Sequence, residues 1–197
     1  FTAKYGTEDG IAFAVGDGNH SLATAKVCWD KLKRELPSDR LEGHPARYAL
    51  CELVSLHDAS LEFEPIHRVV FDKAGEFAEY ARSRLGGESS VKAYACGRVL
   101  PLSVPSDAAA AIDAIQRVID DYCSISGCAT DYIHGAKDTM EIAASCGGTA
   151  IIMPLISKDD LFRSVITRGV LPRKSFSMGE GKDKRYYMEA RLIDDSV

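Results

Sequence analysis

Apolar residues in this chain occur in short runs that alternate with segments of helical spacing. Residues 11–15 and 66–71 form short apolar runs that predict strands. Residues 47–57 are almost continuously apolar, which predicts a strand covered on both faces. After the run at 11–15, residues 20–36 place apolar side chains at steps of three and four and predict an amphipathic helix. That face consists of Leu22, Ala25, Trp29, Leu32 and Leu36.

The pattern changes after residue 73. Residues 74–85 predict a helix that Gly86-Gly87 ends, and Gly97 divides an apolar segment into a hairpin of residues 91–96 and 98–102. Ser106-Asp107 then offers an N-cap for an Ala-rich helix reaching about residue 123. The remaining predicted elements are strands at 130–134 and 149–154, helices at 136–145 and 158–167 (the last capped by Ser157), and a final strand at 184–193.

Strands and helices alternate, but hairpins interrupt the alternation. This favours an α+β fold, a mixed α/β sheet packed with helices, over a doubly wound parallel sheet. We expect three parts: a site domain with the core sheet at 1–72, an inserted α/β lobe at 73–147, and a return to the site domain at 148–197.

Composition and charge narrow the function classes. The 197 residues are 46% hydrophobic, enough for a sizeable core, and the net charge of −5 argues against a nucleic-acid surface. No apolar run approaches the roughly 18 residues that span a bilayer, and no basic-then-apolar leader is present. We therefore expect a cytoplasmic location and no membrane partner. The chain begins at Phe1, and we expect it to be part of a longer protein.

The six cysteines do not show a zinc-ligand spacing. Cys123 and Cys128 are the closest pair, with four residues between them, and no Cys-x-x-Cys occurs. Buried, reduced thiols are the expected state.

The segment with the most chemistry is the turn at residues 16–21, which reads Gly-Asp-Gly-Asn-His-Ser. It lies between the first predicted strand and the first helix. A Gly-x-Gly turn there places backbone N–H groups, including those near Gly16 and Gly18, at a helix N-terminus, where the helix dipole favours an anion such as phosphate. A third glycine and a Gly-Lys-[Ser/Thr] are absent, so neither a dinucleotide fingerprint nor a Walker loop is indicated.

The side chains of this turn have two interpretations. Asp17 is a candidate metal ligand or general base, and Asn19, His20 and Ser21 are candidates to bind or polarise a phosphoryl oxygen. In the alternative, Asp17-Gly18 is only a turn, Asn19 or Ser21 caps the helix, and His20 is exposed.

Glu52 is an acid inside the predicted buried strand. A buried charge is costly unless it is paired, so Glu52 either pairs with Arg47 or Arg68, or is a catalytic carboxylate with a raised pKa.

Two further clusters contain cations. His67 and Arg68 open a predicted strand, from which an Arg could contact phosphate in bidentate fashion. Lys174 and Ser175 lie in a basic loop that could close over an anion. The alternatives are a polar strand entrance and a solvated basic tail.

Three motifs together resemble the bacterial and archaeal family catalogued as domain of unknown function 1015. Its members carry an Asp-Gly-His-His-Arg turn, a Pro-x-His-Arg strand and a Pro-x-Lys-Ser loop. Here these read as residues 17–21, 65–68 and 172–175, with Asn19 and Ser21 replacing the first His and the Arg of the turn. The resemblance is to the C-terminal half of full-length members.

The family is distantly similar to the ParB, sulfiredoxin and free-serine kinase group, in which a Gly-rich turn before a helix binds nucleotide phosphates. This implies a nucleotide or phosphate site at the turn, completed by His67, Arg68, Lys174 and Ser175. It further implies ADP, ATP or CTP with Mg²⁺, and phosphoryl transfer or hydrolysis. Asp17 would then hold the metal, and His20 would act as acid or base.

Other functions remain open. The first is a non-catalytic, nucleotide-responsive regulatory module whose readout is a conformational change or homodimerisation. DNA binding by analogy with ParB is disfavoured by the acidic charge balance. The last is a structural domain without a ligand.

Overall fold

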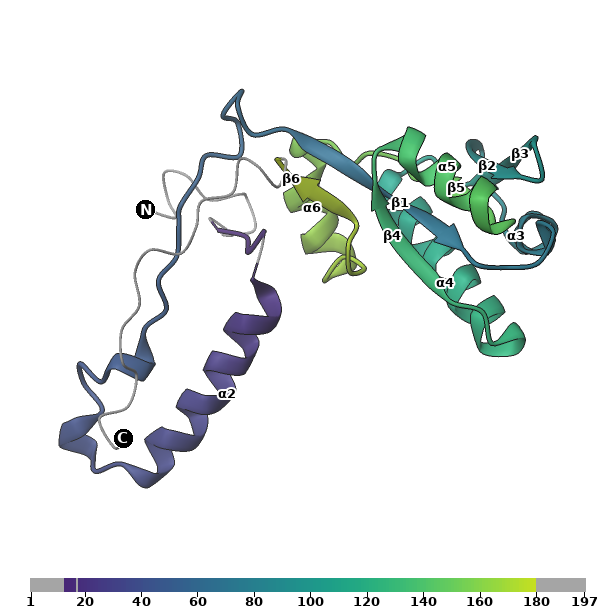
Figure 1. The fold of residues 1–197 in the computed structure, drawn as a ribbon. Coiled ribbons are helices and arrows are strands. Elements are labelled where there is room, and N and C mark those ends of the chain that lie inside the picture. Colours follow the sequence, from purple (N-terminus) through teal and green to yellow (C-terminus); the bar gives the residue numbers. More distant parts are fainter. Residues whose placement is uncertain (1–12, 17, 180–197) are drawn as a thin grey trace. The chain divides into compact units, whose positions relative to one another are not determined.

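The computed structural model describes residues 13–16 and 18–179 (Figure 1). By their internal contacts, the described residues up to 58 belong to one compact unit and those from 59 onward to another. The mixture of helices and one antiparallel sheet confirms the α+β class. No helix in the described ranges is long and apolar enough to cross a membrane.

The first unit is built around helix α2, Asn19–Glu35, which confirms the helix predicted from periodicity. Leu22, Trp29 and Leu32 on its apolar face are half-buried, whereas Ala25 is exposed. The Trp29 ring stacks on His44, with ring centroids 5.6 Å apart. Two short 3₁₀ turns follow, η1 (Ser38–Arg40) and η2 (Pro45–Arg47).

The strand predicted at residues 47–57 is wrong. Residues 48–55 form neither helix nor strand, and Leu50 and Leu53 are 80% and 71% exposed. A strand requires a neighbour for its backbone N–H and C=O groups, and no strand among the described residues pairs with this segment. Residues 13–15 likewise have no regular structure, and the predicted strand at 184–193 lies outside the described residues.

The second unit contains an antiparallel sheet with strand order β3-β2-β5-β1-β4. Short strand β6 pairs with the first three residues of β1. The hairpin predicted around Gly97 is confirmed as β2–β3, in which Ala95 pairs with Arg98. The strands are β1 (Phe63–Val70), β2 (Ser89–Ala95), β3 (Arg98–Val104), β4 (Thr130–His134), β5 (Thr149–Ile152) and β6 (Phe176–Met178).

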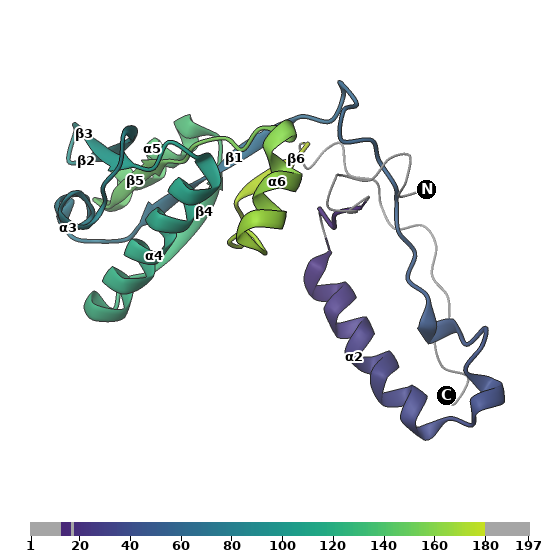
Figure 2. The same ribbon diagram turned by 180° about the vertical axis from the view of Figure 1, so that it is seen from behind.

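Helices cover both faces of this sheet. Figures 1 and 2 show α4 on one face and α5 on the other, and α3 packs with α4. The predicted caps are confirmed: the Asp107 carboxylate accepts from Ala110 N at 2.7 Å, and Ser157 Oγ accepts from Asp160 N at 3.1 Å. These helices are α3 (Glu76–Arg84), α4 (Ala108–Ser126), α5 (Ala136–Cys146) and α6 (Lys158–Arg168).

Strand β1, which lies between β5 and β4, supplies side chains to two hydrophobic clusters. Val70 belongs to the larger cluster with the residues of α3 and α4, whereas Val69 packs with Ala143 of α5 and Ala150. Because side chains alternate along a strand, Arg68 lies on the α4 side and His67 on the α5 side. The three-part domain division at residues 72 and 147 stays a prediction. Strand β1 lies in the same sheet as β2, β4 and β5.

Candidate functional site

The Gly-rich turn leads directly into α2. Gly18 is the N-cap residue, in the left-handed conformation with φ of 76°, and no side chain of the described residues caps the helix. The expectation that Asn19 or Ser21 caps the helix is therefore wrong, whereas the exposure of His20 expected in the same alternative is confirmed. Both residues and His20 lie in the exposed first turn, which contains no acidic residue. Gly16 is exposed and has no regular structure, and Asp17 lies outside the described residues.

Arg68 is fully buried in the second unit and is held by several protein acceptors. Its Nε donates to Gln116 Oε1 at 3.0 Å, and Nη1 donates to the Ile66 carbonyl at 2.7 Å. Its Nη2 donates to the Lys174 carbonyl at 3.1 Å. Gln116 is held in turn by Asp120, whose carboxylate accepts from Nε2 at 2.9 Å. Arg68 thus connects β1, α4 and the loop at residues 172–175.

The charge of Arg68 is stabilised by its surroundings although it is buried. Burial is the main effect and lowers the pKa of Arg68 to about 10, while Tyr132 and Asp120 act in the opposite direction. The guanidinium carbon lies 4.3 Å from the centre of the Tyr132 ring, an attractive cation–π arrangement. Arg68 is therefore still a cation at neutral pH.

The basic loop at residues 172–175 contains one strained residue and is held by a hydrogen bond from the buried Arg68. Lys174 has φ of 56°, which is uncommon outside glycine. Ser175 is buried, and its Oγ donates to the Pro172 carbonyl at 2.5 Å. The side chains of Arg173 and Lys174 are exposed. Such strained residues persist where the surroundings hold them in place, here through Arg68.

His67 lies on the opposite face of β1 and is 4% exposed. Its Nδ1 accepts from Met153 N at 3.1 Å, continuing the contact between β1 and the end of β5. Burial lowers the pKa of His67, and the nearby Arg68 and His134 lower it further. The imidazole is accordingly neutral at neutral pH, with its proton on Nε2.

Because the folded-state pKa of His67 is below its ordinary 6.5, the unfolded chain binds this proton more readily. We predict that this contribution to stability is complete above pH 6.5 and is lost as the pH falls toward the lowered pKa. Urea denaturation between pH 7.5 and pH 5 measures this. His67→Asn, whose Oδ1 can accept from Met153 N, should remove this part of the acid dependence, and exposed His57→Asn should retain it. An unchanged slope in His67→Asn contradicts the assignment.

The structure brings together some of the predicted site residues. Arg68, Lys174 and Ser175 meet at one loop, and His67 lies across the sheet from them. Glu52 is exposed, and an ion pair with Arg47 is not found among the described residues. The composite site of the turn with the other two motifs stays a prediction.

Sequence reasoning missed Gln116, Asp120 and Tyr132. Gln116 gave a usable signal, because it is a polar residue between Ile115 and Ile119 on the apolar face of α4. A polar side chain on such a face needs a buried partner. Its partner, Arg68, is 48 residues away along the chain, so no local pattern indicates the pairing.

Comparison with known proteins identifies the family. Residues 7–122 match the family described as "Protein of unknown function (DUF1015)". The chain belongs to the DUF1015 family. No curated protein and no solved structure matches it. The matched range contains the turn and His67-Arg68, and it ends before the loop at 172–175.

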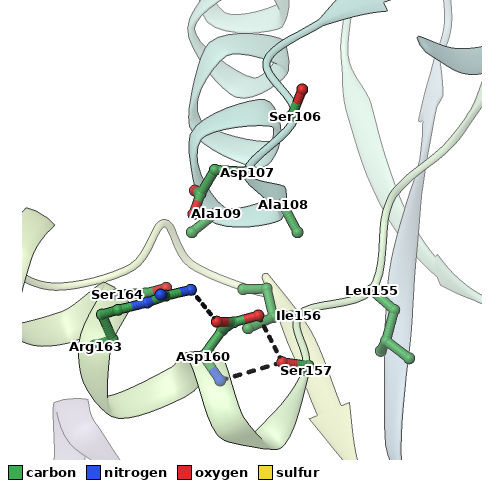
Figure 3. A pocket seen from close by; sticks show the side chains of 10 residues that line it. All are labelled: Ser106, Asp107, Ala108, Ala109, Leu155, Ile156, Ser157, Asp160, Arg163 and Ser164. Carbon is green, nitrogen blue, oxygen red and sulfur yellow. Dashed lines mark hydrogen bonds and ion pairs between the residues drawn. The ribbon is translucent and has the colours of Figure 1, made fainter. Parts of the chain in front are cut away.

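This DUF1015 protein also has a pocket of about 360 Å³ between the first turns of α4 and α6 (Figure 3). Asp107 and Ser157, the two N-caps, lie at its edge, and Asp160 contacts Ser157 and Arg163. Each of these helix starts is capped by a side chain that accepts from one of its first backbone N–H groups, Ala110 N in α4 and Asp160 N in α6. Among the described residues, no group of three or more His, Cys, Asp or Glu side chains could hold a metal ion.

Proposed function

We propose that this DUF1015 protein binds a nucleotide or another phosphorylated small molecule through the turn at residues 16–21. The observation that carries the proposal is the start of α2, where neither a side-chain cap nor an acidic residue occupies the first turn. The N–H groups there, together with the helix dipole of roughly half a positive charge, favour an anion.

The other helices of the described residues support this reading by contrast. Each has an acidic side chain at its start, so its positive end is already compensated. The acids are Glu76 and Glu79 in α3, the N-cap Asp107 of α4, Asp138 in α5, and Asp159 and Asp160 in α6. Of the five described α-helices, α2 alone lacks both an acid in the first turn and a side-chain cap.

The residues around these amides suit a phosphate. The Asn19 amide, the His20 imidazole and the Ser21 hydroxyl are exposed on the first turn and can donate hydrogen bonds. Lys174 is a further proposed phosphate ligand, supported by its exposed cation on the anchored loop. Ser175 was expected beside it, but its buried hydroxyl already donates to the Pro172 carbonyl. In a phosphoryl-transfer enzyme, Asp17 would hold Mg²⁺ and His20 would act as acid or base.

We also propose a similarity to the ParB and sulfiredoxin group, with ADP, ATP or CTP as the ligand.

A regulatory module without catalysis is the second candidate function, because Glu52, the other proposed catalytic carboxylate, is exposed and not in a buried, reactive setting. Incubation with γ-labelled ATP distinguishes the two: label transferred to an acceptor or to water supports the enzyme, whereas binding without transfer supports the module. Homodimerisation on binding, measured by light scattering, is expected for the module.

We predict that Ser21→Asp weakens nucleotide binding by at least about tenfold while stabilising α2 by roughly 0.3–1 kcal/mol. A carboxylate in the first helical turn interacts favourably with the dipole and repels a bound phosphate. Titration calorimetry with ADP, ATP and CTP measures the first effect, and thermal unfolding the second. Thr24→Asp, on the same helix beyond its first turn, is the matched control and should change binding little.

The proposal also requires that ligand stabilises the intact protein. A ligand at 100 times its Kd raises the free energy of unfolding by about 2.7 kcal/mol. If neither the three nucleotides nor inorganic phosphate shifts the melting temperature, the proposal is overturned. If they bind equally well to Ser21→Asp, phosphate binds elsewhere.

A further inference from the structure

Two cysteines meet where helix α4 ends. Cys123 lies in the last turn of α4, and Cys128 follows its C-cap residue, Gly127. Gly127 has φ of 72°, and its N–H donates to the Cys123 carbonyl at 2.9 Å. This left-handed turn reverses the chain, and the two Sγ atoms lie 2.9 Å apart.

The separation is close to that of a bonded pair. A disulfide has an S–S bond of about 2.04 Å, so the two sulfur atoms at 2.9 Å need to approach by only about 0.9 Å. Both side chains are half-buried, which leaves access for a small oxidant. The other four cysteines, Cys28, Cys51, Cys96 and Cys146, are exposed and free. The expectation of buried thiols is wrong for these four.

We propose that Cys123 and Cys128 form a redox modification site, which closes to an intramolecular disulfide when hydrogen peroxide oxidises it and reopens with a dithiol reductant. The thiolate of Cys128 attacks one peroxide oxygen, the O–O bond breaks, and a sulfenic acid and water form. The Cys123 sulfur then attacks the Cys128 sulfur, the S–O bond breaks, and a second water leaves. Two thiols lose two electrons and two protons, and hydrogen peroxide becomes two water molecules.

The surroundings assign the two roles. Burial is the main cause that raises the pKa of Cys123 to about 11, with a further contribution from its contact with Cys128. Cys123 Sγ also lies 3.3 Å from Thr130 Oγ1, which is on β4. The raised pKa keeps the Cys123 sulfur protonated at neutral pH, which disfavours Cys123 as the first nucleophile, since the thiolate is the reactive form.

The bond would fasten two elements that hold Arg68. Helix α4 carries Gln116, a hydrogen-bond partner of Arg68, and β4 carries Tyr132, the ring that contacts the guanidinium. The disulfide would lie where helix α4 ends and the chain continues into strand β4. Oxidation is thus expected to stabilise the second unit whether or not a nucleotide binds.

The test is intact-mass and peptide mapping of the full chain after limited hydrogen peroxide, with alkylation of the remaining thiols. We expect a loss of two hydrogen atoms, a Cys123–Cys128 crosslinked peptide, and a melting temperature raised by about 5 °C that dithiothreitol reverses. Cys123→Ser and Cys128→Ser should lose the crosslink and the shift. Cys96→Ser, which changes an exposed thiol, should retain both.

The outcomes that overturn the proposal are distinct. One is oxygen added to Cys128 without a crosslink in the wild type, and another is a disulfide to one of the four exposed cysteines or to a second copy of the chain. Circular dichroism of the serine variants shows that they are folded before oxidation. If they are not, the wild-type peptide map still decides, because it requires no substitution.

Discussion

Replacing Arg68 with Met is expected to lower the free energy of unfolding by roughly 3–5 kcal/mol, the range for breaking a buried charged network from one side. The substitution removes donors to the Gln116 side chain and to the carbonyls of Ile66 and Lys174. Each buried acceptor left without a partner costs about 1–3 kcal/mol. Met retains most of the apolar volume, so the loss reports mainly on these hydrogen bonds.

Urea denaturation followed by far-ultraviolet circular dichroism measures this effect. Arg68→Lys should recover little, because one ammonium cannot reproduce the planar guanidinium that reaches four acceptors. Arg117→Met on the same helix α4 is the control. Arg117 is exposed and, within the described part of the chain, forms an ion pair with Asp113 alone, so the cost should stay below about 0.5 kcal/mol. A loss under 1 kcal/mol in Arg68→Met would show that Arg68 is not the anchor described here.

Arg68→Met also tests whether Arg68 supports the loop at residues 172–175. Without the bond from Arg68, the Lys174 carbonyl loses its buried donor, and the positive φ of Lys174 loses its support. Amide hydrogen exchange over residues 172–175 is expected to accelerate more than exchange in β2 and β3, which lie elsewhere in the sheet. That result would show that Arg68 supports the loop that carries the exposed cations Arg173 and Lys174, and Lys174 remains the proposed phosphate ligand.

Local patterns in the sequence were sufficient where the structure is determined locally. The helical spacing of Leu22, Trp29 and Leu32 predicted α2, and the caps at Asp107 and Ser157 were read from single residues. Such features depend on contacts within three or four residues. The apolar run at 47–57 failed for the opposite reason: apolar content indicates burial but does not supply the strand that must pair with it.

The candidate site was less predictable, because its main contacts are distant along the chain. Arg68 suggested an exposed phosphate ligand, but its Nη2 bonds to Lys174, 106 residues later. The sequence motifs contain both residues, yet they did not indicate that one supports the other. Gly18 is a further case in which the sequence was insufficient. The sequence predicts the turn there, but only the structure shows that α2 begins at Asn19 and lacks a side-chain cap.

The second large effect is expected at Gly87, which follows α3 and precedes β2. Gly87→Ala should lower the free energy of unfolding by about 2–4 kcal/mol, combining backbone strain and overpacking. Gly87 has φ of 150°, and a Cβ there would lie 2.1 Å from the Val104 carbonyl oxygen, at the end of β3. That oxygen belongs to the backbone, so it cannot move aside as a flexible side chain would.

The preceding residue provides a matched control. Gly86→Ala places a Cβ in open space, and the φ of Gly86 lies outside the left-handed range. This change should be neutral or stabilise by up to about 1 kcal/mol, because alanine restricts the unfolded chain. The two variants share composition and differ by one position, so equal urea midpoints would contradict the close approach of Gly87 to Val104. A large loss in Gly87→Ala alone shows that this glycine sets the spacing between α3 and the β2–β3 hairpin, beyond ending a helix.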